Sequence, residues 1–304
     1  METPGHAAGS AASPGVGLTD LALLAMAIIW GVNYSVVKFA TEVMPPLAFN
    51  AFRVCLAAVV LLLIARGTRP SRRTILVLVL LGVLGNGIYQ VLFVEGVART
   101  RAGDAALIAS ASPAFMAIIG RLRGTERIPG RGVAGILLSL AGMCFVVWGS
   151  GAAAQHASGV SHATAVLGDL LILAGALAWA MYTVLLKPYT HTIDGLQLSA
   201  WTMVGGAIVL GVAGAPDVVR TSWATLPPLA WGAVLYSGFG ALVLAYLFWY
   251  RGVRVLGPTR AAMYGNLQPV IAIAVAWLML GETPTVWQGV GTAAITGGLL
   301  LTRT

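Results

Sequence analysis

Aromatic and amide side chains recur at helical spacing in four stretches of a chain that is otherwise mostly hydrocarbon. The first stretch, "WGVNYSVVK", carries on one helix face Trp30, Asn33, Tyr34 and Lys38. The others contribute Asn86, Tyr89 and Gln90, then Trp179 and Tyr182, and then Tyr264, Asn266 and Gln268. An amide that faced lipid would lack hydrogen-bond partners. These groups are therefore expected to line a solute-binding cavity or, as the alternative, to join neighbouring helices.

Arg53 is the most costly residue in the chain, because it falls about 10 Å inside a predicted membrane span. An arginine at such depth costs at least ~2.5 kcal/mol by insertion scales. We expect it to pair with Glu42 or Glu95, since both acids are predicted on the same side of the membrane. Alternatively, its guanidinium could attract a carboxylate through two parallel hydrogen bonds.

The acidic residues fall at predicted span ends, in loops or in the tail, and none lies at mid-depth. Proton-driven efflux of cationic drugs usually needs a buried acid, so a neutral or zwitterionic solute is favoured. Aromatic rings would hold its apolar part, and amides its amino and carboxyl groups. The four histidines and two cysteines show no metal-ligand spacing and no catalytic arrangement. We therefore expect no metal, no cofactor and no enzyme activity.

Composition indicates an all-α integral membrane protein. Hydrophobic residues make up 58% and charged residues 9% of the 304 positions, whereas an ordinary soluble domain is about 25% charged. The mean hydropathy is +0.88. We attribute the net charge of +8 to loop residues that set orientation and contact anionic lipid, and we expect no nucleic-acid partner.

Runs of about 20 apolar residues predict ten transmembrane helices after a disordered tail at 1–17. The spans are placed at 18–39, 46–65, 73–94, 102–121, 130–149, 166–187, 195–214, 228–250, 259–280 and 285–302. Of the 18 Lys and Arg residues, Arg53 lies within a span and only four follow odd-numbered spans. The rest lie on the opposite side. Because cytoplasmic loops carry excess Lys and Arg, both termini are predicted to be cytoplasmic.

The chain repeats itself. A shift of 149 residues aligns "DLALLAMAIIWGVNYSVVK" with "DLLILAGALAWAMYTVLLK", and a shift of 156 pairs Pro113 with Pro269 and Glu126 with Glu282. One duplication explains both, giving five-helix repeats at 18–149 and 166–304 joined by a loop at 150–165. Five is odd, so the second repeat is predicted to be inverted. Chance similarity between apolar helices is the alternative.

Transporters with inverted repeats bind their solute between the repeats near the membrane midplane. The two prolines would each remove a backbone hydrogen bond, so Pro113 and Pro269 are predicted to act as paired hinges. Spans five and ten are rich in small residues, which could brace each half or join two protomers of a homodimer.

Four segments, "WGVNYSVVK", "AFRVCLAA", "ALIASASPAF" and "LGETPT", resemble the EamA family of the drug/metabolite transporter superfamily. The subgroup that exports aromatic amino acids is the nearest. The resemblance implies ten helices in two inverted halves and export of small metabolites across the bacterial inner membrane. The second copy departs from the pattern with Ala180 and Tyr182 in place of Gly31 and Asn33, and "RGTERI" lacks the full Leu-Gly-Glu of "LGETPT".

We therefore expect a secondary transporter of the inner membrane that exports small metabolites by alternating access, most of all neutral or zwitterionic amino acids. Its expected partners are a small-molecule solute and membrane lipid. The alternatives are efflux of cationic drugs, nucleobases or sugar conjugates, and a receptor or channel without transport activity.

Overall fold

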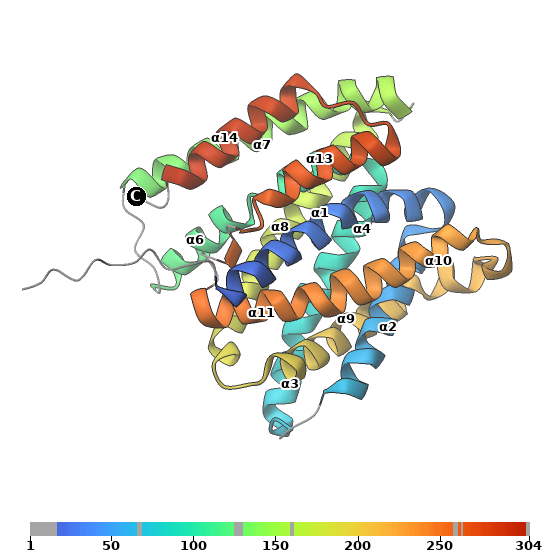
Figure 1. Ribbon diagram of the computed structural model, residues 1–304, viewed down its shortest axis with the longest axis vertical. Coiled ribbons are helices and arrows are strands. Elements are labelled where there is room, and N and C mark those ends of the chain that lie inside the picture. The colour runs from blue at the N-terminus through green and yellow to red at the C-terminus, as the bar shows by residue number, and fades with distance from the viewer. Residues whose placement is uncertain are drawn as a thin grey trace, which may run out of the picture.

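The computed structural model describes residues 17–65, 69–124, 130–158, 161–257, 261–262 and 264–301. Within these ranges all regular structure is helical (Figure 1). Apart from Gly17, the predicted tail lies outside the described residues, as does Glu126. The side chains of 150–158 and of residue 299 are likewise outside the description.

The helices follow one another along the chain in the order α1 (Leu18–Val43), α2 (Pro46–Ile64), α3 (Arg72–Gly82), η1 (Val83–Ile88), α4 (Tyr89–Arg99), α5 (Ala102–Ala109), α6 (Ser112–Leu122), α7 (Gly130–Ser158), α8 (His162–Thr190), α9 (Gly195–Arg220), η2 (Trp223–Thr225), α10 (Pro228–Leu235), η3 (Tyr236–Leu244), α11 (Ala245–Leu256), α13 (Leu267–Leu280) and α14 (Val286–Leu301). Side chains at their starts supply missing hydrogen-bond partners. Ser71 accepts from the Thr74 N–H and Asp194 from the Leu196 N–H. α13 ends at Gly281 with a positive φ, a common helix stop.

Eight membrane spans predicted from the sequence are confirmed as helical segments long and apolar enough to cross a bilayer. They are Leu18–Val43, Pro46–Ile64, Arg72–Arg99, Ala102–Leu122, Gly130–Gly149, His162–Thr190, Gly195–Arg220 and Pro228–Leu256. The ninth and tenth predicted spans are represented by α13, of 14 residues, and α14, of 16 residues. The chain is therefore a multi-pass helical membrane protein, and the count of ten spans stays a prediction.

The segment 150–165, which we expected to be a loop, is mostly helical. α7 continues to Ser158 and α8 begins at His162. The alanines after residue 150 have high intrinsic helix propensity, so the helix continues beyond the length that hydropathy alone indicated.

Two spans are interrupted at corresponding places. A turn at Ser110–Ala111 separates α5 from α6, and a turn at Gly265–Asn266 precedes α13. Pro113 lies in the first turn of α6, and Pro269 is the third residue of α13. A proline there removes no helical hydrogen bond, because the first N–H groups of a helix are unpaired in any case. The expected loss of a mid-helix hydrogen bond is therefore wrong, and the helix breaks lie just before the prolines.

Two further irregularities also correspond. η1 and η3 are π-helical segments within the third and eighth spans. Shifting Val83–Ile88 by 156 residues gives 239–244, which is the last part of η3. The repeat seen in the sequence is thus accompanied by a repeat in backbone irregularity.

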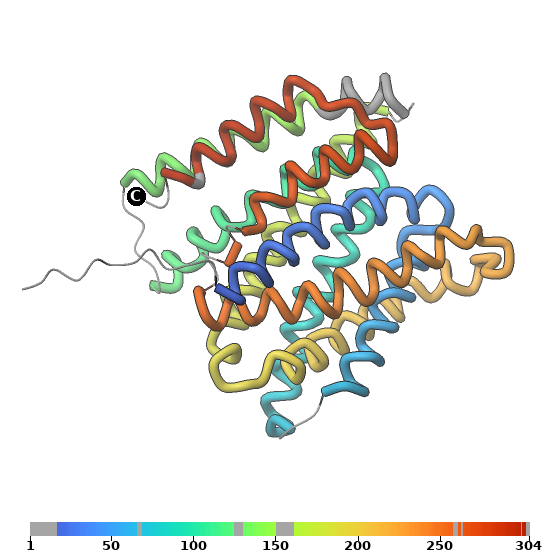
Figure 2. Tube along the Cα trace, viewed as in Figure 1, coloured from blue at the N-terminus to red at the C-terminus, as the bar shows by residue number. Residues whose placement is uncertain are grey.

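The two repeats are packed into each other along their whole length. α1 contacts α13 and α11, and its counterpart α8 contacts α6 and α4. α2 packs on α9, and α7 on α14, the latter pair forming one edge of the bundle in Figure 2. Each of these contacts therefore has an equivalent contact when every helix is replaced by its counterpart in the other repeat. The core of the protein is therefore the interface between the repeats.

Glycines on α9 let it approach α3 and η1 closely. A Cβ added at Gly205 would lie 2.1 Å from the Val79 carbonyl oxygen, whereas one added at Gly211 would meet no atom of the described residues within 4 Å. We predict that Gly205→Ala destabilises the purified protein by about 1–3 kcal/mol through overpacking. Gly211→Ala, on the same helix, should have no effect or raise stability slightly. Thermal unfolding in detergent measures both, and equal melting temperatures for the two variants would contradict the close approach.

Candidate functional site

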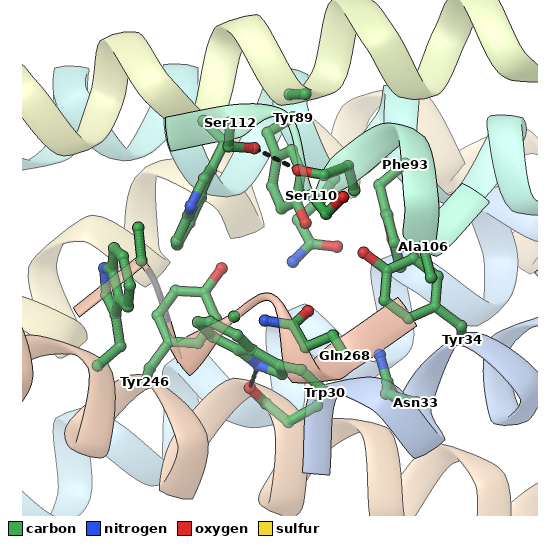
Figure 3. A pocket seen from close by; sticks show the side chains of 18 of the residues that line it. Trp30, Asn33, Tyr34, Tyr89, Phe93, Ala106, Ser110, Ser112, Tyr246 and Gln268 are labelled. Atoms are coloured by element: carbon green, nitrogen blue, oxygen red, sulfur yellow. Dashed lines mark hydrogen bonds between the residues drawn. The ribbon is translucent and has the colours of Figure 1, made fainter. Parts of the chain in front are cut away.

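A cavity of about 90 Å³ lies where the two interrupted spans meet α1, α4, α8 and α11. Space of this size holds several water molecules. Figure 3 shows Ser110, Ser112 and Tyr89 on one side of it and Trp30, Gln268 and Tyr246 on the other. Both helix breaks therefore reach the same space. Irregular backbone at membrane depth is tolerated where it lines such a cavity.

A contiguous group of aromatic rings lines the cavity. The Trp30 and Trp179 rings lie 6.0 Å apart and almost perpendicular, and Tyr246 lies 5.7 Å from each. Trp249 and Tyr89 extend the group, at 5.8 Å and 5.1 Å from Trp179. Such edge-on and tilted contacts are favourable for aromatic pairs. The two tryptophans matched by the sequence repeat are therefore in direct contact.

The π-helix η3 holds Trp30 in place. The Ala245 N–H donates to the Gly240 carbonyl, one residue earlier than in an α-helix. The Ala241 carbonyl, released from its α-helical partner, accepts a hydrogen bond of 2.9 Å from the Trp30 indole. The backbone irregularity thus has a role in the cavity wall.

Arg53 is fully buried and reaches the cavity from α2. Its guanidinium donates to Asn50 Oδ1 at 2.8 Å, to Gln90 Oε1 at 2.7 Å and to Ser237 Oγ at 2.5 Å. Ser237 in turn donates to Asn33 Oδ1 at 2.6 Å. The network joins α1, α2, α4 and η3, and so links the two repeats.

The expected pairing of Arg53 with Glu42 or Glu95 is wrong. Glu95 forms an ion pair with Arg99 on its own helix, and the other ion pair among the described residues joins Arg101 to Glu282. Three neutral oxygens accept hydrogen bonds from the guanidinium instead. Sequence reasoning missed Asn50 and Ser237, although Asn50 lies three residues before Arg53 on the same helix face.

Eight of the twelve predicted binding residues line the cavity, as do Arg53 and Pro113. The eight are Trp30, Asn33, Tyr34, Tyr89, Gln90, Trp179, Asn266 and Gln268. Tyr246 and Trp249, which also line it, were missed. Their spacing of three residues is the same signal that identified Trp30 and Asn33.

Four predicted residues lie elsewhere. Lys38 donates to the Ala98 carbonyl at 3.1 Å, and Tyr264 donates to Asp20. The Tyr182 hydroxyl is 2.5 Å from that of Tyr250. Asn86 is buried against Gly206. The stripe from Trp30 to Lys38 is about 12 Å long at 1.5 Å per residue, so its far end passes the cavity.

A second polar cluster joins the repeats at the end of the bundle where α1 and α13 finish, which we call the Glu282 end. Both carboxylate oxygens of Glu282 accept from the Ala102 N–H, at 3.2 and 3.1 Å, and so cap α5. Arg101 lies 3.9 Å from Glu282 and donates to the Thr283 carbonyl. Gln288 donates to Asp104 at 2.9 Å. At the opposite end, where α1 begins, Tyr264 bonds Asp20.

Comparison with known proteins gives a consistent picture. The family described as the EamA-like transporter family matches residues 17–148 and 166–304. The uncharacterized transporter YyaM of Bacillus subtilis is 28% identical, with 91% of each chain covered. A probable terminal-alkyne amino-acid exporter of Streptantibioticus cattleyicolor is 25% identical over 93% of this chain and 92% of its own. One solved crystal structure shares the fold, with a TM-score of 0.62, 20% identity and coverage of 94% and 97%.

The bond between Arg53 and Ser237 provides a test of the network. Ser237→Ala leaves one guanidinium nitrogen without its acceptor, and we expect a loss of about 1.5–3 kcal/mol, as for hydrogen bonds to charged groups. Ser35 is the matched control, because its buried hydroxyl has no hydrogen-bond partner in the described part of the chain. Ser35→Ala should be neutral or stabilising. Thermal unfolding of both variants checks this, and a Ser237→Ala variant as stable as the wild type would exclude the network.

Proposed function

The chain belongs to the EamA-like transporter family, and from this membership we propose that it is a secondary transporter that exports small zwitterionic metabolites, amino acids first among them. The observation that carries the proposal is the cavity at which two interrupted helices meet, lined by aromatic rings and amides from both repeats. Secondary transporters commonly bind their solutes at such breaks.

The lining of the cavity suits an amino acid. The aromatic wall offers apolar surface for a side chain and can attract an ammonium group. Asn266, at the second helix break, has a buried side-chain oxygen that no described residue hydrogen-bonds, and this oxygen can accept from that ammonium. The name of the Streptantibioticus relative as an amino-acid exporter supports the same class. A cationic drug fits less well, because Arg53 is the only charged residue among the described residues that line the cavity.

We further propose that the repeats are inverted and that both termini lie in the cytoplasm of a bacterial inner membrane. The five-span repeats and the charge asymmetry of the loops support this orientation. The Glu282 end then faces outward. The hydrogen bonds of Glu282, Arg101 and Gln288 across the repeats hold that end shut, and alternating access requires them to open.

Counterflow in proteoliposomes tests the transport proposal. Proteoliposomes that contain the purified protein and are loaded with an unlabelled aromatic amino acid should accumulate the labelled form. Asn266→Ala should raise the half-saturation concentration about tenfold, because it removes one acceptor for a charged group. Met279→Ala, on the exposed face of α13 and outside the cavity lining, is the control and should transport normally. Binding without exchange would identify a receptor, and flux that does not saturate would identify a channel.

The gate is tested by labelling a cysteine placed behind it. On a background of Cys55→Ser and Cys144→Ser, Ala106→Cys puts a thiol on the cavity wall. Glu282→Gln weakens the cap on α5 and the contact with Arg101. A membrane-impermeant maleimide added outside intact cells should then react about 5- to 30-fold faster, as for a loss of 1–2 kcal/mol.

Glu95→Gln is the matched control for the gate. Among the described residues Glu95 forms its ion pair with Arg99 on its own helix alone, so its neutralisation should leave the labelling rate unchanged. A Glu282→Gln variant labelled no faster than this control would contradict the gate.

A further inference from the structure

The guanidinium of Arg53 is a buried charge beside the cavity, and its hydrogen-bond partners among the described residues are neutral. Arg53 is 0% exposed, and it contributes the only formal charge among the described residues that line the cavity. Neutral oxygens satisfy hydrogen-bond donors but leave the net charge in place. A buried charge without an opposite charge is unfavourable. The site is therefore suited to an anionic group that arrives with the solute.

The hydrogen bonds of Arg53 leave donors available for such a group. An arginine has five N–H donors, and Asn50, Ser237 and Gln90 occupy one each on the Nε, Nη1 and Nη2 atoms. One N–H remains on each of the two terminal nitrogens. These remaining N–H groups can make charge-assisted hydrogen bonds to a carboxylate.

We infer that Arg53 binds the carboxylate of the solute and thereby restricts this transporter to substrates that carry one. This inference rests on the transport function proposed above and names the feature by which that same cavity selects its substrate. It reverses our preference from the sequence, which gave Arg53 a structural partner among the acids. The cost of burying Arg53 is offset each time a substrate carboxylate occupies the site.

The surroundings of Arg53 also define the orientation of the substrate. The guanidinium carbon lies 5.2 Å from the Phe49 ring centre and 6.0 Å from that of Phe93. Figure 3 places Phe93 at the end of the open space opposite Tyr246. Ring contacts of Phe93 with Tyr89 at 5.7 Å and of Tyr89 with Trp179 at 5.1 Å connect the two ends. The carboxylate therefore lies at the Phe93 end, and an apolar side chain extends toward Trp30 and Trp179.

A purely structural role for Arg53 is the competing explanation, because its hydrogen bonds already join four helical segments. The two roles differ in what they require of the substrate. A structural arginine stabilises the protein whether or not the solute has a carboxylate. An arginine that binds the carboxylate discriminates between solutes that differ in that group alone.

The experiment compares phenylalanine, phenylalaninamide, phenethylamine and 3-phenylpropionate as ligands of the purified protein. Binding is measured by calorimetry and by competition in counterflow. We expect phenylalaninamide and phenethylamine to bind about 10- to 100-fold more weakly than phenylalanine, and 3-phenylpropionate to retain more affinity than phenethylamine. Arg53→Gln should abolish this discrimination. Arg53→Lys, which keeps the charge but loses the planar pair of donors, should retain part of it.

The outcomes separate this inference from the proposed function. If the wild type exchanges phenylalanine and its amide equally well, Arg53 does not select a carboxylate, while the transport function stands. If no amino acid exchanges at all, the proposed function fails, and the binding series alone decides the role of Arg53. Should Arg53→Gln fail to fold, the wild-type series together with Arg53→Lys still gives the answer.

Discussion

The burial of one arginine within a membrane span constrains the rest of this structure. Arg53 has no acidic partner among the described residues, so its donors must find neutral oxygens at fixed positions on other helices. Gln90 on α4 and Ser237 in η3 supply two of them, and Ser237 is itself fixed by Asn33 on α1. These bonds set the separation of the helices around the cavity. The same hydrogen bonds therefore form part of the cavity wall and join the two repeats.

The irregular backbone also contributes to the cavity. A helix with all its hydrogen bonds made presents only side chains to a cavity, whereas a break or a π-helical turn also presents backbone groups. The break at Ser110–Ala111 and that at Gly265–Asn266 both open into the cavity, and η3 supplies the carbonyl that holds Trp30. The two breaks correspond to each other under the sequence repeat, as do η1 and the last part of η3.

Hydropathy and spacing predicted the parts of the structure that depend on local sequence. The first eight spans follow from apolar run length, and Trp30 and Trp179 follow from the repeat. The predictions that were wrong concern the depth of a residue along its helix or contacts between residues far apart in the sequence. Helical spacing put Lys38 on the correct face but not at the correct depth, and Tyr182 is removed from the cavity by Tyr250. The sequence predicted an acidic partner for Arg53, because it does not reveal that three neutral oxygens from separate positions converge on the guanidinium.

The neutral partners of Arg53 also fit a protein whose repeats must move. Breaking a buried ion pair costs about 3–5 kcal/mol, whereas a hydrogen bond to a charged group contributes about 1.5–3 kcal/mol. Of the three hydrogen bonds of Arg53, the bond to Ser237 crosses between the repeats. This hydrogen bond can break and re-form at the lower of the two free-energy costs. An acidic partner at that position would tie the repeats together and would also neutralise the charge beside the cavity. The neutral partners of Arg53 thus suit both the motion of the repeats and the binding of an anionic group.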